Sequence, residues 1–113
     1  DYYDAAFSAV DQLITPARTA ASTHVFHQYT LKLDGVDRAA LIKHLADKGV
    51  PAMIYYPVPL HLQKSYQETR YKAGDFPVAE QLSECVMSLP MHTELTDEQL
   101  KYITDSVLEF ISK

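Results

Sequence analysis

The sequence predicts an α+β fold in which helices cover a small sheet of about three strands. Residues 24–33 alternate apolar and polar side chains with a period of two, which is typical of a half-buried strand. Residues 37–48 and 96–111 instead carry capping residues followed by apolar side chains three and four positions apart, which is typical of amphipathic helices. The length of 113 residues fits one domain with a single core.

The composition indicates a globular protein without a nucleic-acid or membrane partner. Acidic and basic residues are mixed and the net charge is −5, whereas nucleic-acid binding calls for a basic face. No apolar run approaches the roughly 20 residues that cross a bilayer, and no signal-peptide pattern opens the chain. The single cysteine, Cys85, cannot form an internal disulfide, which fits a reducing compartment and predicts a cytoplasmic location.

The first ten residues predict a helix. Its apolar side chains share one helical face at the spacing i, i+3, i+4, i+7: Tyr3, Ala6, Phe7 and Val10. The chain does not begin with Met and this segment is similar to a helix cut mid-course, so we expect a fragment of a longer protein. Pro16 ends any helix, and residues 15–23 predict a connector of small side chains.

The alternation in residues 24–33 places His27 on the apolar face of the predicted strand. A lone histidine on such a face is usually a hydrogen-bonded core residue and less often part of a site. His24 and His27 point to opposite faces of a strand and cannot bind one metal together. The five histidines never pair with cysteine or carboxylates at ligand spacing, so we expect no metal site.

A capped helix follows the turn at Asp34-Gly35. Asp37 predicts its N-cap, Val36 with Leu41 predicts a hydrophobic staple, and Gly49 predicts the left-handed stop after its last turn. We expect three of its residues to form the buried stripe: Leu41, Ile42 and Leu45. We expect four others to face water: Arg38, Lys43, Asp47 and Lys48.

The second half of the chain predicts two further strands and two further helices. Residues 50–55 and 87–89 predict the strands, and residues 60–69 predict one or two helical turns. A helix from Pro77 to about Cys85 should direct three side chains inward: Val78, Leu82 and Val86. The last helix starts at a capping box of Thr96 and Gln99 and carries one apolar face to the C-terminus: Leu100, Ile103, Val107, Phe110 and Ile111.

The stretch from Tyr55 to Gln63 is the candidate binding loop. Pro57 and Pro59 hold the residues before them, Tyr56 and Val58, out of helical conformations. Stiff loops that display aromatic and titratable side chains often make ligand contacts. Residue types alone still favour a simpler interpretation, in which the loop is rigid and its tyrosines cover an edge of the core.

From His24 onward, seven motifs occur in one order with characteristic gaps: His24-x-x-His27-Gln28-Tyr29, Gly35-Val36-Asp37-Arg38, Gly49, Tyr56-Pro57-x-Pro59-Leu60-His61-Leu62-Gln63, Phe76-Pro77-x-Ala79-Glu80, Leu89-Pro90-Met91-His92 and Leu95-Thr96-Asp97-Glu98-Gln99. Together they resemble the C-terminal small domain of the DegT/DnrJ/StrS family of sugar aminotransferases, which are fold-type-I enzymes that use pyridoxal phosphate. The resemblance implies a mainly antiparallel sheet. It also implies that residues 1–23 are the end of a helix and a connector from a large domain, and that residues 24–113 are the small domain.

The resemblance further implies an activity for the complete protein. Such enzymes transfer an amino group, typically from glutamate, to a keto sugar attached to a nucleotide, in the biosynthesis of surface polysaccharides or related amino sugars. The Schiff-base lysine lies in the family's large domain, so we expect no catalytic or cofactor-binding residue here. We expect the lysines to be solvated surface residues: Lys43, Lys48, Lys64, Lys72 and Lys101. The implied partners are the large domain, a second subunit of a homodimer and the nucleotide sugar.

The residues that match the family's substrate-binding rim are Tyr55, Tyr56 and His61. Many relatives resemble His-Tyr-Pro where this chain has Tyr55-Tyr56-Pro57, a difference that bears on which sugar nucleotide is bound, because a phenol donates one neutral hydrogen bond whereas an imidazole can carry charge. Two non-enzymatic alternatives stay open. The chain could be a stand-alone regulatory, ligand-sensing module, since family members are also described as pleiotropic regulators, or a structural dimerisation module.

Overall fold

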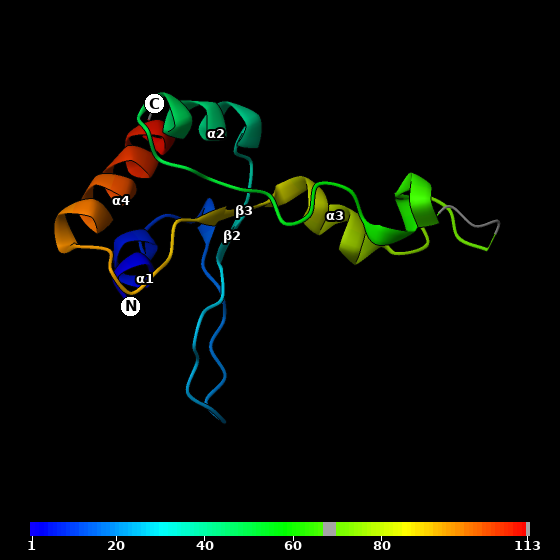
Figure 1. The fold of residues 1–113 in the computed structure, drawn as a ribbon, viewed down its shortest axis with the longest axis horizontal. Helices are drawn as coiled ribbons and strands as arrows, with labels where there is room; N and C mark the ends of the chain where they lie inside the picture. The colour runs from blue at the N-terminus through cyan, green and yellow to red at the C-terminus, as the bar shows by residue number, and fades with distance from the viewer. Residues whose placement is uncertain (67–69, 113) are drawn as a thin grey trace.

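A three-stranded antiparallel sheet in the order β1-β2-β3 forms the centre of the computed structural model, which describes residues 1–66 and 70–112 (Figure 1). The central strand β2 (Tyr29–Leu33) pairs with β1 (Leu13–Ile14) on one side and with β3 (Val86–Leu89) on the other. Four helices accompany the sheet: α1 (Tyr2–Phe7), α2 (Arg38–Asp47), α3 (Pro77–Cys85) and α4 (Asp97–Ile111). The predicted α+β class with a mainly antiparallel sheet is therefore confirmed.

The strand predicted at residues 24–33 forms only from Tyr29 onward. Tyr29 pairs with Leu89, the last residue of β3. The residue after it is Pro90, which has no N–H to extend the ladder. Before Tyr29 the backbone therefore leaves the sheet, and Val25 is 89% exposed. The prediction that His27 lies on the apolar face is wrong, because its side chain is exposed outside the sheet.

The strand predicted at residues 50–55 is also wrong. Only Met53 pairs with the sheet, in an isolated antiparallel bridge to Ser88. The Met53 N–H donates to the Ser88 carbonyl at 3.0 Å, and the Ser88 N–H donates to the Met53 carbonyl at 2.7 Å. Pro51 cannot donate to a ladder, which limits pairing before this point. The remaining strand of the sheet is instead β1, which lies between the helix predicted in the first ten residues and the connector predicted at residues 15–23.

The predicted starts of α2 and α4 are confirmed. The Asp37 side chain accepts from the Ala40 N–H and caps α2, while Thr96 and Gln99 form the predicted capping box of α4. Gly49, after α2, has a φ of 73°, the left-handed conformation that favours glycine.

The core lies on one face of the sheet, between the sheet and the helices α1, α2 and α4. β2 contributes three alternate side chains, Tyr29, Leu31 and Leu33, to a cluster whose other buried members come from both ends of the chain: Tyr3, Phe7, Leu13, Leu41, Leu45, Val50, Met87, Leu89, Ile103 and Val107. The predicted apolar faces of α1, α2 and α4 therefore do point inward. The domain boundary near residue 23 stays a prediction, although residues on both sides of it share this core.

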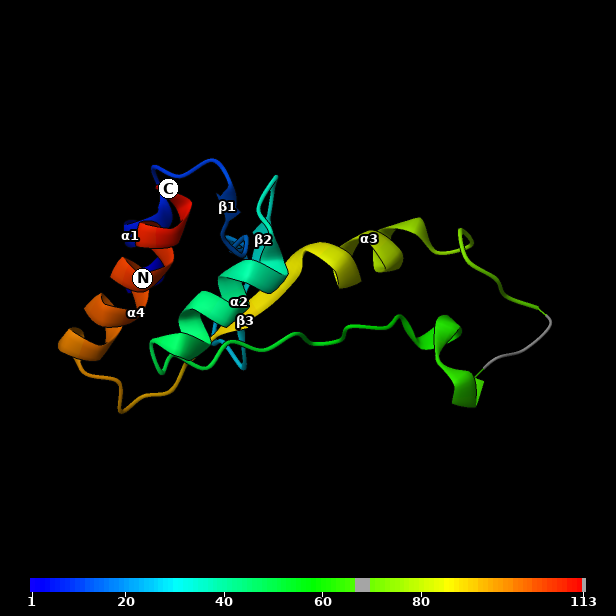
Figure 2. The same cartoon turned by 90° about the horizontal axis from the view of Figure 1, so that it is seen from above.

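Residues 57–66 and 70–85, which we call the arm, project away from this core (Figures 1 and 2). The arm contains two short 3-10 turns, η1 (Leu60–Leu62) and η2 (Lys64–Tyr66), followed by α3. The turns fall within the predicted helical stretch 60–69, whose last residues, 67–69, lie outside the described residues.

The prediction that α3 directs its apolar face inward is wrong for two residues. Val78 is 69% exposed and Leu82 is 39% exposed, whereas Val86 is buried because it belongs to β3. Periodicity identifies the apolar face of a helix but does not say what covers it. Since α3 extends beside the loop of the arm and not over the core, this face is open (Figure 2).

Candidate functional site

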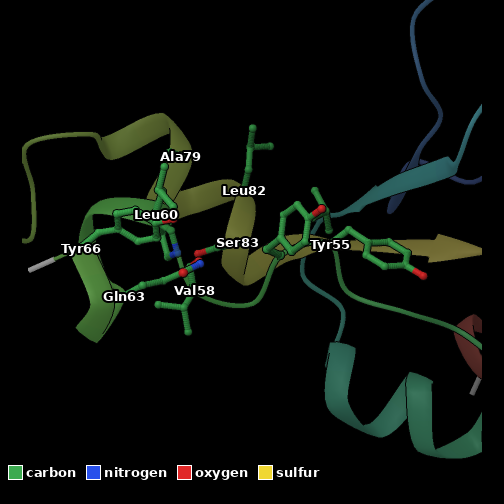
Figure 3. A pocket seen from close by; sticks show the side chains of 11 residues that line it. Tyr55, Val58, Leu60, Gln63, Tyr66, Ala79, Leu82 and Ser83 are labelled. Atoms are coloured by element: carbon green, nitrogen blue, oxygen red, sulfur yellow. The ribbon is translucent and has the colours of Figure 1, made fainter.

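A cleft of about 470 Å³ lies between the two chain segments of the arm (Figure 3). The loop that leaves the core and the two 3-10 turns form one wall, and α3 with the start of β3 forms the other. The lining residues are Tyr55, Tyr56, Val58, Pro59, Leu60, Gln63, Tyr66, Ala79, Leu82, Ser83 and Val86. The lining is therefore aromatic and aliphatic, with phenols, one amide and one hydroxyl as its polar side-chain groups.

The structure places Tyr55 and Tyr56 together at the core end of this cleft. Their rings meet edge to face with centroids 6.0 Å apart, and the peptide bond between them is cis. Tyr56 is 71% exposed and Tyr55 is 39% exposed. Both side chains are therefore open to solvent and neither belongs to the core cluster, so they do not cover the core as the simpler interpretation of the loop proposed.

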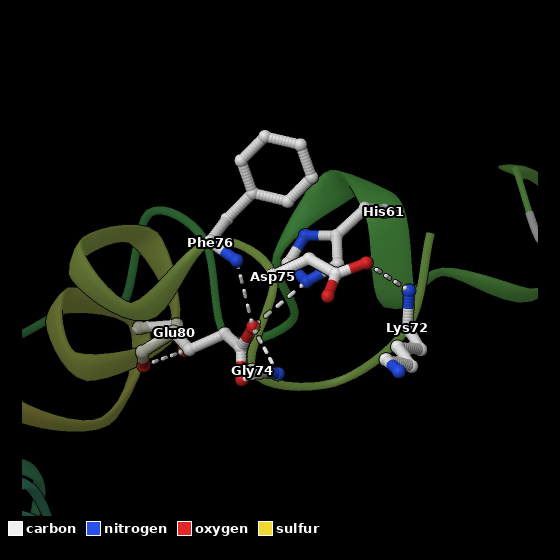
Figure 4. A network of polar contacts seen from close by, with 7 residues as sticks. His61, Lys72, Gly74, Asp75, Phe76 and Glu80 are labelled. Carbon is white, nitrogen blue, oxygen red and sulfur yellow. Dashed lines mark hydrogen bonds and ion pairs between the residues drawn. The ribbon is translucent and has the colours of Figure 1, made fainter. Parts of the chain in front are cut away.

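His61 lies apart from the two tyrosines and does not line the cleft. Its side chain is only 8% exposed, and its Nε2 atom lies 3.0 Å from Glu80 Oε1 on α3 (Figure 4). A carboxylate only accepts hydrogen bonds, so the imidazole donates from Nε2. The Glu80 carboxylate also accepts from the N–H groups of Gly74 and Phe76.

The environment of Glu80 favours its ionised form. Partial burial by itself would raise the pKa of this carboxyl group, but hydrogen bonds from the Gly74 N–H, the His61 ring and the Phe76 N–H together lower the pKa below its ordinary value. An ionised Glu80 is the state that can accept from all three donors.

Arg38 supports one wall of the cleft. Helical periodicity predicts that this residue faces water, and that prediction is wrong. Its Nη1 atom donates to the carbonyl of Ser83 at 2.6 Å and to that of Val86 at 3.0 Å. These carbonyls lie at the end of α3 and the start of β3, where the orphan acceptors of a helix C-terminus attract a cation. Arg38 therefore ties the α3 wall to α2. Its place in the motif Gly35-Val36-Asp37-Arg38 is the signal in the sequence that could have indicated this role.

Among the described residues that line the cleft, the phenols are the only ionisable groups. None of its lining residues is a lysine, arginine, histidine or carboxylate, and among the described residues no group of three His, Cys, Asp or Glu side chains could hold a metal ion. Such a lining can stack on rings and exchange neutral hydrogen bonds. No helix in the described part of the chain is long and apolar enough to cross a membrane.

The described residues that line this cleft do not fit pyridoxal phosphate. That group needs a lysine for its aldehyde and cations or N–H groups for its phosphate, and the cleft offers no cation. Three of the predicted surface lysines are instead engaged with carboxylates: Lys43 with Asp47, Lys48 with Glu109, and Lys101 with Asp105.

Comparison with known proteins gives consistent matches over nearly the whole chain. The profile of the DegT/DnrJ/EryC1/StrS aminotransferase family matches residues 1–108. The pleiotropic regulatory protein of Geobacillus stearothermophilus is 40% identical over 88% of this chain and 26% of its own length. The UDP-N-acetyl-3-dehydro-alpha-D-glucosamine 3-aminotransferase of Acidithiobacillus ferrooxidans is 41% identical over 78% of this chain and 23% of its own length.

Solved structures give the same result for the fold. An aminotransferase from Brucella abortus superposes with a TM-score of 0.85 and 32% identity, and it covers 98% of this chain and 29% of its own. DesV from S. venezuelae superposes with a TM-score of 0.90 and 27% identity over the same shares of the two chains. The chain therefore spans about a quarter of the length of the curated relatives that it matches.

Proposed function

The chain belongs to the DegT/DnrJ/EryC1/StrS aminotransferase family, and we propose on this premise that it is the C-terminal domain of a nucleotide-sugar aminotransferase. The complete protein would transfer an amino group from an amino acid, with glutamate as the expected donor, to a nucleotide-linked keto sugar. The observation that carries this proposal is the family match over residues 1–108. Relatives named as transaminases of UDP- and dTDP-linked amino sugars support the class of substrate.

We propose that the cofactor, pyridoxal phosphate, is held by residues outside this chain. The family implies this cofactor, and it supplies the electron sink of transamination when bound. The neutral aromatic cleft supports a different task for the domain described here, which is to bind and orient the sugar nucleotide.

Tyr55 and Tyr56 are the residues proposed to contact substrate. A phenol ring stacks on the apolar face of a sugar or on a base, and its hydroxyl donates one hydrogen bond to a sugar hydroxyl. Both rings line the cleft and are accessible. The third predicted contact, His61, stays a prediction, and its buried ring with a carboxylate partner supports an indirect role better than direct contact.

The proposed partners are the large domain and a second subunit of a homodimer. Large apolar side chains on the arm are open to solvent, including Val78, Leu60 and Tyr66 at 69%, 62% and 57% exposure. Exposed apolar side chains that form a large patch often belong to an interface. The predicted cytoplasmic location is part of the same proposal, and the thiol of Cys85 is free.

The regulatory alternative rests on names among the relatives. One of them is a pleiotropic regulatory protein, and another is a sensory transduction protein of erythromycin biosynthesis. A ligand-sensing role would use the same cleft to bind a sugar nucleotide without turning it over.

The test is an assay of the complete protein with two probes. UDP-N-acetyl-3-dehydro-alpha-D-glucosamine with glutamate tests the forward reaction, and dTDP-3-amino-3,6-dideoxy-alpha-D-galactopyranose with 2-oxoglutarate tests the reverse reaction. Mass spectrometry reports the amino or keto sugar that is formed. Turnover of either probe supports the aminotransferase, whereas binding of both probes without turnover supports the regulatory alternative. The isolated 113-residue chain is the negative control.

Two variants test the proposed contacts in that assay. Tyr56→Phe should raise the KM for the sugar nucleotide about 5-fold, since it removes one hydrogen bond worth about 1 kcal/mol. Tyr55→Ala should raise it about 10-fold, because it removes a whole stacking face. Tyr2→Phe, on α1 and 38% exposed, is the matched control. Unchanged kinetics in both cleft variants would remove these residues from the site.

A further inference from the structure

We propose that His61 and Glu80 form a positioning pair that holds the two walls of the cleft at a fixed separation and so sets the affinity for the sugar nucleotide. The proposal rests on the function proposed above for the cleft. In this proposal neither side chain touches the substrate. His61 and Glu80 act on binding only by holding the walls in place.

The two walls are tied at the core end by contacts that do not involve this pair. The loop wall is fixed by the two backbone hydrogen bonds between Met53 and Ser88 on β3. The α3 wall runs directly into β3 and is held by Arg38 through the carbonyls of Ser83 and Val86. At this end the spacing of the walls is therefore set by the sheet.

The far end of the arm has no sheet to set this spacing, and there the His61–Glu80 contact crosses between the walls. His61 lies in η1 of the loop wall and Glu80 lies in the first turns of α3, 19 residues later. Leu60 and Ala79, the residues directly before them, both line the cleft. A displacement of the pair would therefore move the lining of both walls.

The Glu80 carboxylate of the pair accepts hydrogen bonds from three groups (Figure 4). Besides His61 Nε2 at 3.0 Å, Glu80 accepts from the Gly74 N–H at 2.8 and 2.9 Å and from the Phe76 N–H at 3.3 Å. The Phe76 ring covers the imidazole with centroids 4.8 Å apart. Among the described residues, each partner of the carboxylate is thus a donor, which an anionic acceptor satisfies best.

This donor set makes an isosteric substitution informative. Glu80→Gln keeps the size of the side chain but replaces one acceptor oxygen with an NH2 group, which would face the Gly74 N–H or the His61 ring. His61→Leu removes the donor but retains an apolar side chain against Phe76. His61→Gln restores an N–H donor, so it should recover part of the effect. Glu84→Gln, on the exposed side of the same helix, is the matched control.

The first measurement is the kinetics of the complete protein with whichever probe is turned over. Glu80→Gln and His61→Leu should each raise the KM for the sugar nucleotide about 10-fold, as displaced positioning groups do. The half-reaction with glutamate alone should stay within about 2-fold of the wild type, because it does not use the sugar cleft. A KM that is unchanged in both variants, or one that rises equally in Glu84→Gln, overturns the proposal.

The second measurement is amide hydrogen exchange in the 113-residue chain, which does not depend on any activity. The Gly74 and Phe76 amides should exchange faster in Glu80→Gln, while the β2 amides keep wild-type rates. Unchanged exchange at these two amides also overturns the proposal. Absence of turnover in the wild-type protein refutes the proposed function instead, and the exchange rates then still decide whether the pair holds the walls together.

Discussion

The substitution Phe7→Ala tests whether the first residues of the chain belong to the same folding unit as the rest. Phe7 ends α1 and is 1% exposed, with its ring stacked on Tyr3 at a centroid distance of 6.0 Å. Its cluster includes side chains of β2 and α4 such as Leu31 and Val107. Truncation of a buried phenylalanine to alanine costs about 3–5 kcal/mol, because it removes buried apolar surface and leaves a cavity.

That cost is a large fraction of the about 5–15 kcal/mol that holds a domain of this kind together. We expect the midpoint of thermal unfolding to fall by about 15 °C, from about 4 °C per kcal/mol for a domain of this size. Urea unfolding at 25 °C, followed by far-UV circular dichroism, gives the free energy of unfolding directly, with an unchanged slope against urea. Tyr2→Ala, on the same helix and 38% exposed, should cost less than about 1 kcal/mol.

The comparison of these two variants decides the question. If residues 1–23 were only a connector from a large domain, Phe7→Ala would cost no more than Tyr2→Ala, and the shared core described above would be refuted as a cooperative unit. A loss of about 3 kcal/mol or more would instead move the functional boundary of this domain toward the N-terminus, ahead of α1.

Two further predictions concern the caps and the buried phenols. Thr96→Ala removes the acceptor of the Gln99 N–H and should lower the free energy of unfolding by about 1 kcal/mol in urea titrations. Thr93→Ala, in the loop before α4, is the control and should have little effect. Equal effects of the two substitutions would refute the role of Thr96 as a cap. Burial raises the pKa of the Tyr3 phenol from 10.0 to about 12, so the folded state holds this proton more tightly than the unfolded state. The contribution of the protonated Tyr3 phenol to the free energy of unfolding is therefore complete below pH 10 and is lost as the pH rises from 10 to 12. Stability should fall over that range in the wild type and less steeply in Tyr3→Phe, which also loses the hydrogen bond to the Pro90 carbonyl; parallel pH curves would refute the assignment.

The sequence predicts those parts of this fold whose signals are local. The capping residues Asp37 and Thr96 and the glycine stop at Gly49 lie within a few residues of the backbone groups that they satisfy, and all three are confirmed. β1 has only two residues, Leu13 and Ile14, and exists because β2 lies beside it. No pattern within the segment itself specifies such a pairing.

In the candidate site, too, local conformation could be predicted from the sequence, whereas contacts between distant segments could not. Residue types alone do not select Tyr55 and Tyr56, which come from the family resemblance, but the extended loop that carries them could be predicted from its two prolines. The Arg38 contacts and the His61–Glu80 pair could not, because they join segments that are 45 and 19 residues apart. The family motifs contained Arg38, His61 and Glu80, but a motif does not say which of its members touch one another.

The residues that attach the cleft to the core are different from the residues that only line it. All four residues of β3 are buried, and both walls of the cleft start from it, one through the Met53–Ser88 bridge and the other through the junction of α3 with Val86. Residues farther along the arm, such as Leu60, contribute little to the core cluster. Substitutions there can change the lining of the cleft at little cost in stability, since most exposed positions tolerate change within about 0.5 kcal/mol. A fold built in this way can accept different side chains in the cleft while its sheet keeps the core ends of the two walls in the same register.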